Sequence, residues 1–229
     1  CWCSSSKALG SYHTLVPFVY YLFHVPNHQV PKNQTSKFRK SLYLFGFATP
    51  FSRYADSRLG KFIKEELKPL QQKNIYSFPF DRAVLWVNYW ERISEYGPEL
   101  LQRNPRLAIY LVQNYTGAKT QYKVNAQEID HIFPRSILRE KSFDEAEINH
   151  FANFWIMSKG KNQNKSNKHP KTYFKDVDET DMKRALIDRD MLNYTKYKVF
   201  LQQRGKEILA HVKKKVGFLD DDFCINNEE

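Results

Sequence analysis

The chain has 229 residues, of which 41% are hydrophobic and 15% aromatic, so it is long and apolar enough to bury a core. Lysine and arginine total 36 against 25 acidic residues, which gives a formal net charge of +11 and a pI near 9.4. This balance favours a polyanionic partner such as nucleic acid, and a basic surface that only contacts solvent is the alternative.

The sequence does not have the patterns expected of a disulfide-rich, zinc-binding, membrane-spanning or nucleotide-binding protein. Cys1, Cys3 and Cys224 lie near the chain ends without metal-ligand spacing, so we expect neither a disulfide framework nor a zinc site, and we expect a reducing, cytoplasmic location. No segment approaches the ~20 apolar residues of a membrane span, so no membrane partner is expected. The phosphate loops GxxxxGK[ST] and GxGxxG are both absent, so we expect no nucleotide site.

Helical patterns fill the first half of the chain. The apolar run 15–23 predicts a core helix, and leucine, phenylalanine and isoleucine recur at helical spacing over 59–70. A second stripe over 84–93 predicts a helix that closes near Gly97-Pro98. Residues 100–112 predict a further helix, either interrupted at Pro105 or started afresh there. We interpret these stripes as core faces.

The pattern changes between residues 117 and 174. Residues 124–132 predict a short extended segment that leads to Pro134, and 154–157 predict a second apolar strand. The polar stretch 158–168 is compatible with a short helix ended by Pro170. After this region the apolar positions of 197–212 predict a long helix, with Asn193 as its N-cap and Gly217 as its stop.

Asp130 and His131 stand together at the end of the first predicted strand. Phosphodiester hydrolysis needs a base, a divalent cation and rigid positioning of both. A histidine with a pKa near ~6.5 can take a proton at neutral pH, and Asp and Asn oxygens suit magnesium, which keeps most of its waters. Adjacent strand residues point to opposite faces, so one side chain could face the cation and the other the attacking water. An isolated Asp-His pair is more often structural than catalytic.

The wider motif resembles a known family of nucleases. The runs DHIFP at 130–134 and KNQNKS at 161–166, with Asn153 between them, resemble the HNH or ββα-metal endonuclease motif, in the variant whose last metal ligand is Asn. The spacing of nine residues from Asn153 to Asn162 is similar to that in the HNH domain of CRISPR-type RNA-guided nucleases.

The resemblance implies a role for each matching residue. It implies His131 as the general base, Asp130 and Asn162 as ligands of a single magnesium or manganese ion, and Asn153 as the residue that holds the histidine-bearing loop through backbone hydrogen bonds. Spacing favours Asn162 over Asn164 or Asn167 as the second ligand.

Basic and amide side chains crowd the motif, and around a nuclease centre they would bind phosphates without reading sequence. We expect Lys165 at the scissile region. The remaining candidates for phosphate or DNA binding are Arg135, Lys159, Lys161, Asn164, Asn167 and Lys168. Asn164 and Asn167 could instead be capping residues. His150 and His169 flank the motif, and we interpret both as loop residues.

A second resemblance covers most of the chain. The segments FRKSLYLFGFATPFSRYADSRLGKFIKE and YKVFLQQRGKEIL, together with the motif, resemble the C-terminal half of GmrSD-type, modification-dependent restriction proteins. The family's N-terminal half, which carries nucleotide-dependent and sensing functions, has no counterpart here. The chain also lacks an initiating Met, so we expect a fragment of a longer protein whose N-terminal sensing domain is a partner.

These observations predict an α+β protein, mainly α, with a small ββα-metal HNH module between helical regions. The expected boundaries are a helical region at 1–119, the HNH module at 120–176 and a helical C-terminal tail at 177–229 that packs on the rest. The expected function is metal-dependent endonuclease cleavage of DNA in prokaryotic defence against foreign or modified DNA. A nucleic-acid-binding module that does not cut, and an RNA-cutting relative, are the alternatives.

Overall fold

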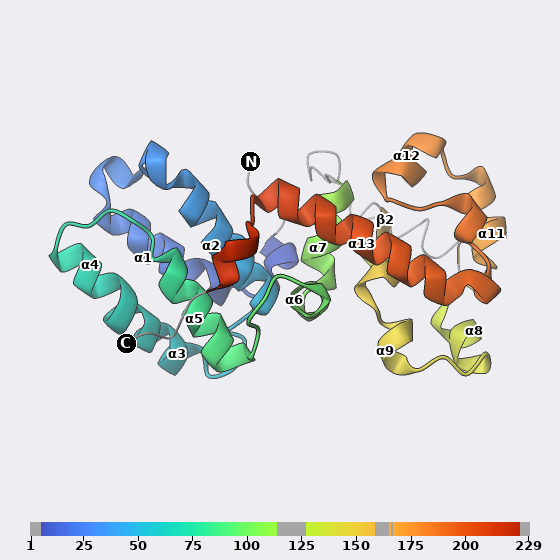
Figure 1. Cartoon of the computed structure of the whole chain (residues 1–229), viewed down its shortest axis with the longest axis horizontal. Helices are drawn as coiled ribbons and strands as arrows, with labels where there is room; N and C mark the ends of the chain where they lie inside the picture. Colours follow the sequence, from blue (N-terminus) through green and yellow to red (C-terminus); the bar gives the residue numbers. More distant parts are fainter. Residues whose placement is uncertain (1–5, 114–126, 159–164, 166, 225–229) are drawn as a thin grey trace. The chain divides into compact units, whose positions relative to one another are not determined.

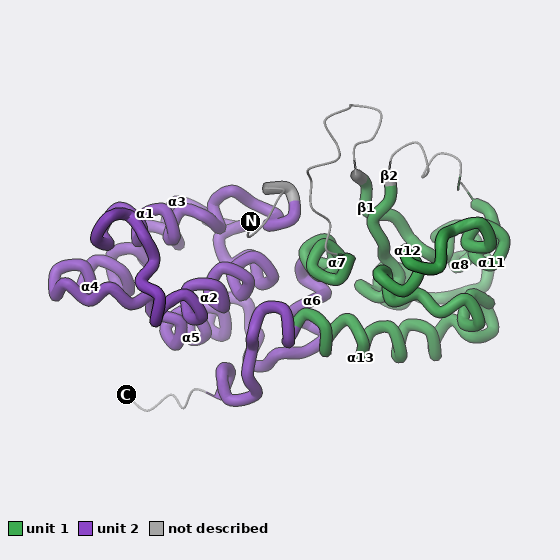
Figure 2. The backbone as a smooth tube through the Cα atoms, turned by 90° about the horizontal axis from the view of Figure 1, so that it is seen from above, with its two compact units in different colours: residues 1–4, 105–212 green, residues 5–104, 213–229 purple. Residues whose placement is uncertain are grey.

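The computed structural model describes residues 6–113, 127–158, 165 and 167–224 (Figure 1). Its described part is mainly helical with a two-stranded antiparallel sheet, which confirms the expected α+β, mainly α class. The chain divides into two compact units (Figure 2). We call residues 5–104 and 213–229 the helical unit, and residues 1–4 and 105–212 the sheet unit. No helix in the described ranges combines the length and apolar character that a membrane crossing requires.

The helical unit is built around one buried helix, α2. Residues 40–48 of α2 are all buried, and Phe45 makes edge contacts with Phe51 and Phe62. A π-helical turn at Ile63–Leu67 joins α3 to α4. The α-helices described in this unit are α1 (Val16–His24), α2 (Thr35–Ala48), α3 (Ala55–Phe62), α4 (Lys68–Gln72), α5 (Phe80–Glu91) and α6 (Pro98–Arg103).

The structure decides where one predicted helix starts, at Pro105, and contradicts the predicted end of another, near Gly97-Pro98. Residues 98–113 form two helices, α6 and α7 (Pro105–Gln113), so a new helix starts at Pro105. Proline is accommodated there because the first N–H of a helix has no partner within the helix, so its absence removes no hydrogen bond. The expectation that the preceding helix closes near Gly97-Pro98 is wrong. Helix α5 ends at Glu91 because Arg92 adopts a left-handed conformation (φ 59°), and its N–H bonds the carbonyl of Asn88 at 2.9 Å.

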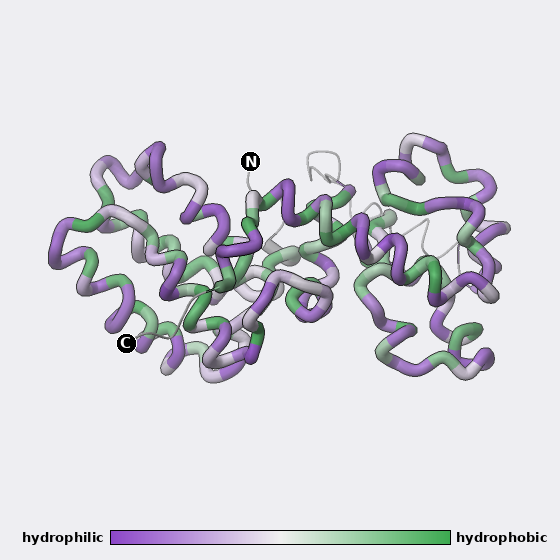
Figure 3. The backbone as a smooth tube through the Cα atoms, viewed as in Figure 1, coloured by the Kyte–Doolittle hydropathy of each residue, from purple (hydrophilic) through white to green (hydrophobic). Residues whose placement is uncertain are grey.

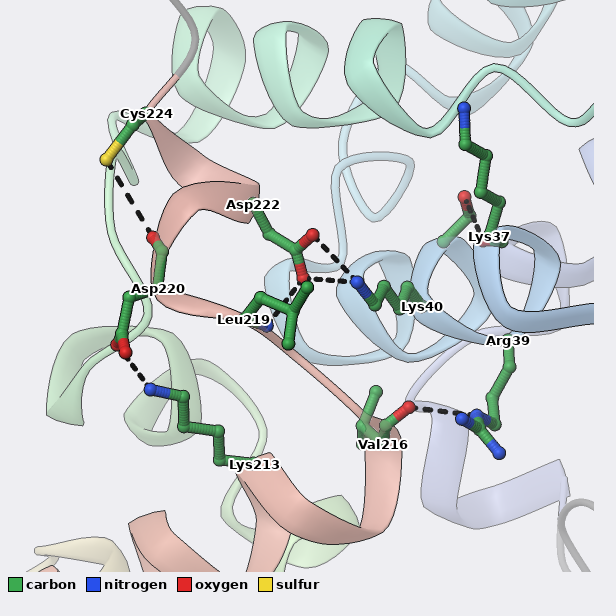
Figure 4. Close-up of polar contacts among 10 residues, drawn as sticks. Lys37, Arg39, Lys40, Lys213, Val216, Leu219, Asp220, Asp222 and Cys224 are labelled. Carbon is green, nitrogen blue, oxygen red and sulfur yellow. Dashed lines mark hydrogen bonds and ion pairs between the residues drawn. The ribbon is translucent and has the colours of Figure 1, made fainter.

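The C-terminal segment of the helical unit is tied to α2 (Figure 4). Lys40 Nζ lies 2.7 Å from both carboxylate oxygens of Asp222, which belongs to the 3-10 turn Asp220–Phe223. Arg39 Nε donates to the carbonyl of Val216 at 2.8 Å, and Lys213 pairs with Asp220. Residues 213–224 therefore pack within the helical unit through polar contacts as well as apolar ones.

The sheet unit contains the predicted strand pair. Strand β1 (Gln127–His131) runs antiparallel to β2 (Phe154–Ser158), and the two lie side by side in Figure 2. Residues 124–126 of the first predicted strand lie outside the described residues. The other elements are α7, α8 (Arg135–Glu140), α9 (Glu145–Ile148), a 3-10 turn at Phe151–Asn153, α11 (Pro170–Tyr173), α12 (Glu179–Arg184) and α13 (Tyr197–Val216), with the unit boundary falling within α13 after Val212.

Helix α13 agrees with its sequence pattern. The apolar residues predicted to form its buried face are all buried, namely Tyr197, Phe200, Leu201, Ile208 and Val212. Figure 3 shows hydrophobic and hydrophilic stretches alternating along the helix. Asn193 caps the 3-10 turn Tyr194–Lys196 that leads into α13, and Gly217 (φ 85°) follows the last helical residue. The predicted stop at Gly217 is confirmed, whereas Asn193 caps the 3-10 turn that precedes α13 and not α13 itself.

Pro170 has a different role from the expected one. Most of the predicted polar helix at 158–168 lies outside the described residues. Within the described part, Pro170 begins α11 instead of only ending a helix, and the His169 side chain accepts a hydrogen bond from the Lys171 N–H as its N-cap. Proline suits the first helical position because its φ is preset and its N–H would be unpaired there.

Candidate active site

Asp130 and His131 lie at the end of β1, beside an open cleft. In the strand register Asp130 faces Trp155 and His131 faces Phe154, and the chain then turns through residues 132–134 into α8. The cleft has a volume of about 390 Å³. Its lining residues are Asp130, His131, Pro134, Arg135, Ser136, Arg139, Lys165 and Asn167. The fold thus brings five of the eleven sequence-predicted site residues to this cleft, namely Asp130, His131, Arg135, Lys165 and Asn167.

Asn153 is fully buried and holds the loop that follows His131. Its Oδ1 accepts a hydrogen bond from the Phe133 N–H at 2.9 Å, and its Nδ2 donates to the carbonyls of Phe133 at 3.3 Å and Ile148 at 3.0 Å. Its own carbonyl accepts from the Ile132 N–H at 2.6 Å. These contacts match the holding role that the resemblance implies, because they fix the backbone on the C-terminal side of His131.

Asp130 is paired with a buried lysine. Lys165 Nζ lies 2.6 Å from Asp130 Oδ2 and also donates to the carbonyl of His131, and its side chain is only 2% exposed. Burial lowers the pKa of Lys165, and the Asp130 carboxylate opposes that shift. Lys165 therefore orients the two residues at the strand end, instead of reaching freely into solvent as a phosphate-binding lysine does.

His131 is half-buried and contacts the side-chain amide of Asn149, a residue outside the predicted motif. Its Nε2 lies 3.2 Å from Asn149 Oδ1, and its ring packs on Phe154 with centroids 4.5 Å apart. Burial lowers the pKa of His131 below 6.5, while the Asn149 hydrogen bond and the Asp130 charge act in the opposite direction. The ring is therefore mainly neutral at neutral pH, which is the form a general base requires.

The cleft has a basic rim. The side chains of Arg135 and Arg139 are about half exposed, and both lie near Glu145, at 3.9 Å and 2.6 Å respectively. Asn167, which lines the cleft, and Lys168 next to it are exposed. Arg135, Arg139 and Lys168 can meet a polyanion without burying an unpaired charge.

Four of the predicted site residues cannot be placed. Asn162, Lys159, Lys161 and Asn164 lie outside the described residues, so their expected roles stay predictions. The two flanking histidines are placed, and both cap helical turns, since His150 Nδ1 accepts from the Ala152 N–H at 3.1 Å and His169 caps α11. Neither lines the cleft.

Arg204 of α13 is a supporting residue that the sequence analysis missed. Its guanidinium is buried and donates to the carbonyls of Ala185, Leu186 and Ala152, the last of which precedes Asn153. It thereby connects the tail helix to the turn that carries Asn153. No local pattern marks this role, because one basic residue on a helix normally faces solvent.

Gln113 supports the second strand in a comparable way. At the end of α7, its Oε1 accepts from the Ile156 N–H at 2.6 Å and its Nε2 donates to the Ile156 carbonyl at 3.2 Å. The side-chain amide thus pairs with the backbone N–H and carbonyl of Ile156 in β2, as a neighbouring strand would.

One of the two expected metal ligands, Asp130, lies among the described residues. Asp130 places a carboxylate, a donor type that magnesium prefers, on the cleft wall, where its side chain is 22% exposed. Within the described ranges there is no group of three or more His, Cys, Asp or Glu side chains that could hold a metal ion. A site made of one Asp, one Asn and several waters would not form such a group. Asp130 is therefore a donor of the type that magnesium binds, and its Oδ2 is paired with Lys165 in this structure.

Comparisons of the chain with protein-family models, curated proteins and solved structures find no match.

Proposed function

We propose that the chain is a metal-dependent HNH endonuclease that hydrolyses DNA phosphodiester bonds. The observation that carries this proposal is the clamp made by Asn153. Its side chain fixes the loop behind His131, while the half-buried imidazole and the Asp130 carboxylate stand at the wall of an open cleft with a basic rim. A neutral base held rigidly beside a hard oxygen donor suits hydrolysis of a phosphodiester.

In this proposal His131 takes a proton from a water molecule that attacks phosphorus in line with the 3′ oxygen. The new bond joins the water oxygen to phosphorus, the bond from phosphorus to the 3′ oxygen breaks, and a proton from solvent completes the 3′ hydroxyl. The products carry a 5′ phosphate and a 3′ hydroxyl. Magnesium or manganese held by Asp130 and Asn162 would neutralise charge that develops on the phosphoryl and leaving oxygens. Arg135 and Lys168 would contact flanking phosphates.

A broader role rests on the sequence resemblance. A GmrSD-like origin supports a function in prokaryotic defence against foreign or modified DNA, with a sensing domain in the same protein as a partner. The scarcity of cysteine supports a cytoplasmic site of action.

The contact between Lys165 and Asp130 favours a second candidate. An ammonium group already neutralises the carboxylate that would hold the cation. A nucleic-acid-binding module that does not cut would keep this pair permanently. Such a module would bind DNA equally well in EDTA, whereas cleavage by the proposed nuclease would stop.

The test is cleavage of supercoiled plasmid and of a matched RNA in magnesium, manganese or EDTA. We expect cation-dependent nicking of the plasmid that is lost in His131→Ala and retained in His169→Ala, which changes a histidine of the same unit outside the cleft. The new 5′ ends should accept a labelled phosphate only after phosphatase treatment. Equal nicking by His131→Ala and the parent would refute the assigned base. Salt-sensitive DNA binding without cleavage in any condition would favour the binding module.

A further inference from the structure

Asn149 links His131 to a carboxylate behind it. Asn149 follows α9, and its Oδ1 lies 3.2 Å from His131 Nε2. Its Nδ2 lies 2.9 Å from the Glu145 backbone carbonyl and 2.9 Å from Glu145 Oε2. The other carboxylate oxygen of Glu145 accepts from Arg139 Nε at 2.6 Å. The side chains thus form a chain of contacts from the rim of the cleft to the imidazole.

The chemistry of Glu145 fixes which way the Asn149 amide points. A backbone carbonyl and an ionised carboxylate can only accept hydrogen bonds, so the side of Asn149 that faces Glu145 must be its NH₂ group. The amide oxygen then faces the imidazole, and because an amide oxygen only accepts, His131 Nε2 must carry the proton of that bond. The neutral imidazole consequently keeps its lone pair on Nδ1.

We propose that Asn149 is the positioning residue of the candidate base, and that it holds His131 in the tautomer whose Nδ1 accepts the proton of the attacking water. This inference rests on the proposed function. Asn149 does not line the cleft and acts only through His131. Its contact also sets the plane of the ring, together with the packing of the ring on Phe154.

The position of Asn149 depends on a helix that is well defined at its start. Asp144 caps α9 by accepting from the Glu147 N–H at 2.7 Å, and the Glu147 side chain returns to the Asp144 N–H. The N–H of Asn149 bonds the Glu145 carbonyl at 3.0 Å. Helix α9 therefore both positions the Asn149 amide and provides its partner Glu145. The orientation of the His131 ring is consequently set by this one short helix.

The direct test is nitrogen-15 NMR of the histidine rings at about pH 8, where an ordinary imidazole is neutral. The His131 signal is identified by its loss in His131→Gln. We expect the parent to carry its proton on Nε2, with exchange slowed by the bond to Asn149. In Asn149→Ala that proton should exchange rapidly and both tautomers should appear. Asp178→Ala removes the N-cap of α12 in the same unit and leaves every contact of the Asn149 amide described above in place, so it should keep the parent pattern.

Plasmid cleavage supplies the second readout. Asn149→Ala should lower kcat by about tenfold to a hundredfold with little change in KM, as for other residues that orient a reacting group. Asn149→Asp combined with Glu145→Gln reverses the side-chain contact between these two positions and keeps an acceptor against Nε2, although the bond to the backbone carbonyl of residue 145 is lost. The double variant should therefore recover part of the loss in kcat and part of the slow exchange. Rescue of this kind is not expected from a residue that only stabilises the fold.

The outcomes separate this inference from the nuclease proposal. A parent protein with its proton on Nδ1, or an Nε2 proton unchanged in Asn149→Ala, would overturn the positioning role even if the plasmid is cut. The expected NMR pattern in a protein that cuts neither DNA nor RNA would support the contact and overturn the nuclease.

Discussion

Lys165 Nζ lies 2.6 Å from Asp130 Oδ2, and only 2% of the lysine side chain is exposed. The pair brings together two residues 35 positions apart in the sequence, one at the end of β1 and the other in the Lys-rich stretch after β2. Since the same ammonium group also bonds the His131 carbonyl, the pair fixes the strand end on which the candidate base stands.

The first prediction concerns the coupling of this pair. Lys165→Met leaves Asp130 without its buried partner, whereas Asp130→Asn with Lys165→Met removes both charges. We expect a coupling energy of about 1 to 3 kcal/mol in a double-mutant cycle measured by urea unfolding. A coupling energy near zero would mean that the pair contributes nothing to the folded state. The control is the corresponding cycle of Arg184→Met and Asp181→Asn, which removes an exposed pair and should show almost no coupling.

The second prediction concerns Asn153. Asn153→Ala removes three side-chain hydrogen bonds and leaves buried backbone groups of Phe133 and Ile148 without partners. We expect a loss of about 2 to 4 kcal/mol in the free energy of unfolding. Nicking activity should also fall under conditions where the variant is still folded, because the loop after His131 loses its anchor.

Asn193→Ala is the matched control for this change. It removes the cap of the 3-10 turn before α13, a single exposed hydrogen bond, and should cost about 1 kcal/mol without affecting nicking. An Asn153→Ala protein as stable and as active as the parent would show that the loop is held by other contacts.

The third prediction is a pH dependence of stability that arises from His150. Burial, and then the charge of Arg204, lower the pKa of His150 below 6.5 in the folded protein. Between that lowered value and 6.5 the unfolded state binds more protons, so the free energy of unfolding falls as the pH drops through this window. Above pH 6.5 the contribution of His150 is constant.

His150→Asn isolates this effect. Asparagine can keep the side-chain acceptor for the Ala152 N–H, and it does not titrate. Unfolding by urea at a series of pH values from about 5 to 8 should give a shallower acid slope for the variant than for the parent. His131, whose pKa is also lowered, contributes to both curves and cancels in their difference. Parallel curves would contradict the assignment to His150.

The fourth prediction concerns the C-terminal turn in Figure 4. Asp222 pairs with Lys40 and accepts from the Leu219 N–H at 2.7 Å, and both charged side chains are about nine-tenths buried. Asp222→Asn should therefore lower the free energy of unfolding by about 1 to 3 kcal/mol and expose the segment after Gly217 to proteases.

Asp220→Asn is the control within the same turn. Its pair with Lys213 leaves the Asp220 side chain 92% exposed, so we expect no measurable change in stability or in proteolysis. Equal stability and equal proteolysis of the two variants would show that the buried pair of Lys40 and Asp222 stabilises the turn no more than the exposed pair of Lys213 and Asp220 does.

The sequence predicted those parts of the fold that depend on local pattern. Apolar residues at helical spacing marked the buried face of α13. Pro105 marked a break in the helical pattern, because a proline has no N–H to give to a helix interior, and the structure decided that a new helix, α7, starts there. The extended pattern before Pro134 and the apolar run after Asn153 predicted β1 and β2. The end of α5 was not predictable in this way, since Arg92 carries no sequence signal for a left-handed conformation.

Residue types and their spacing, with the resemblance that they support, also selected Asp130, His131 and Asn153 as members of one site. Only the tertiary structure showed how that site is held. It paired Asp130 with Lys165, set Asn149 against His131 and brought Arg204 to the turn before Asn153. These contacts join segments up to 52 residues apart. Each depends on which polar groups are buried together and must find partners there, and that is decided when the whole unit packs.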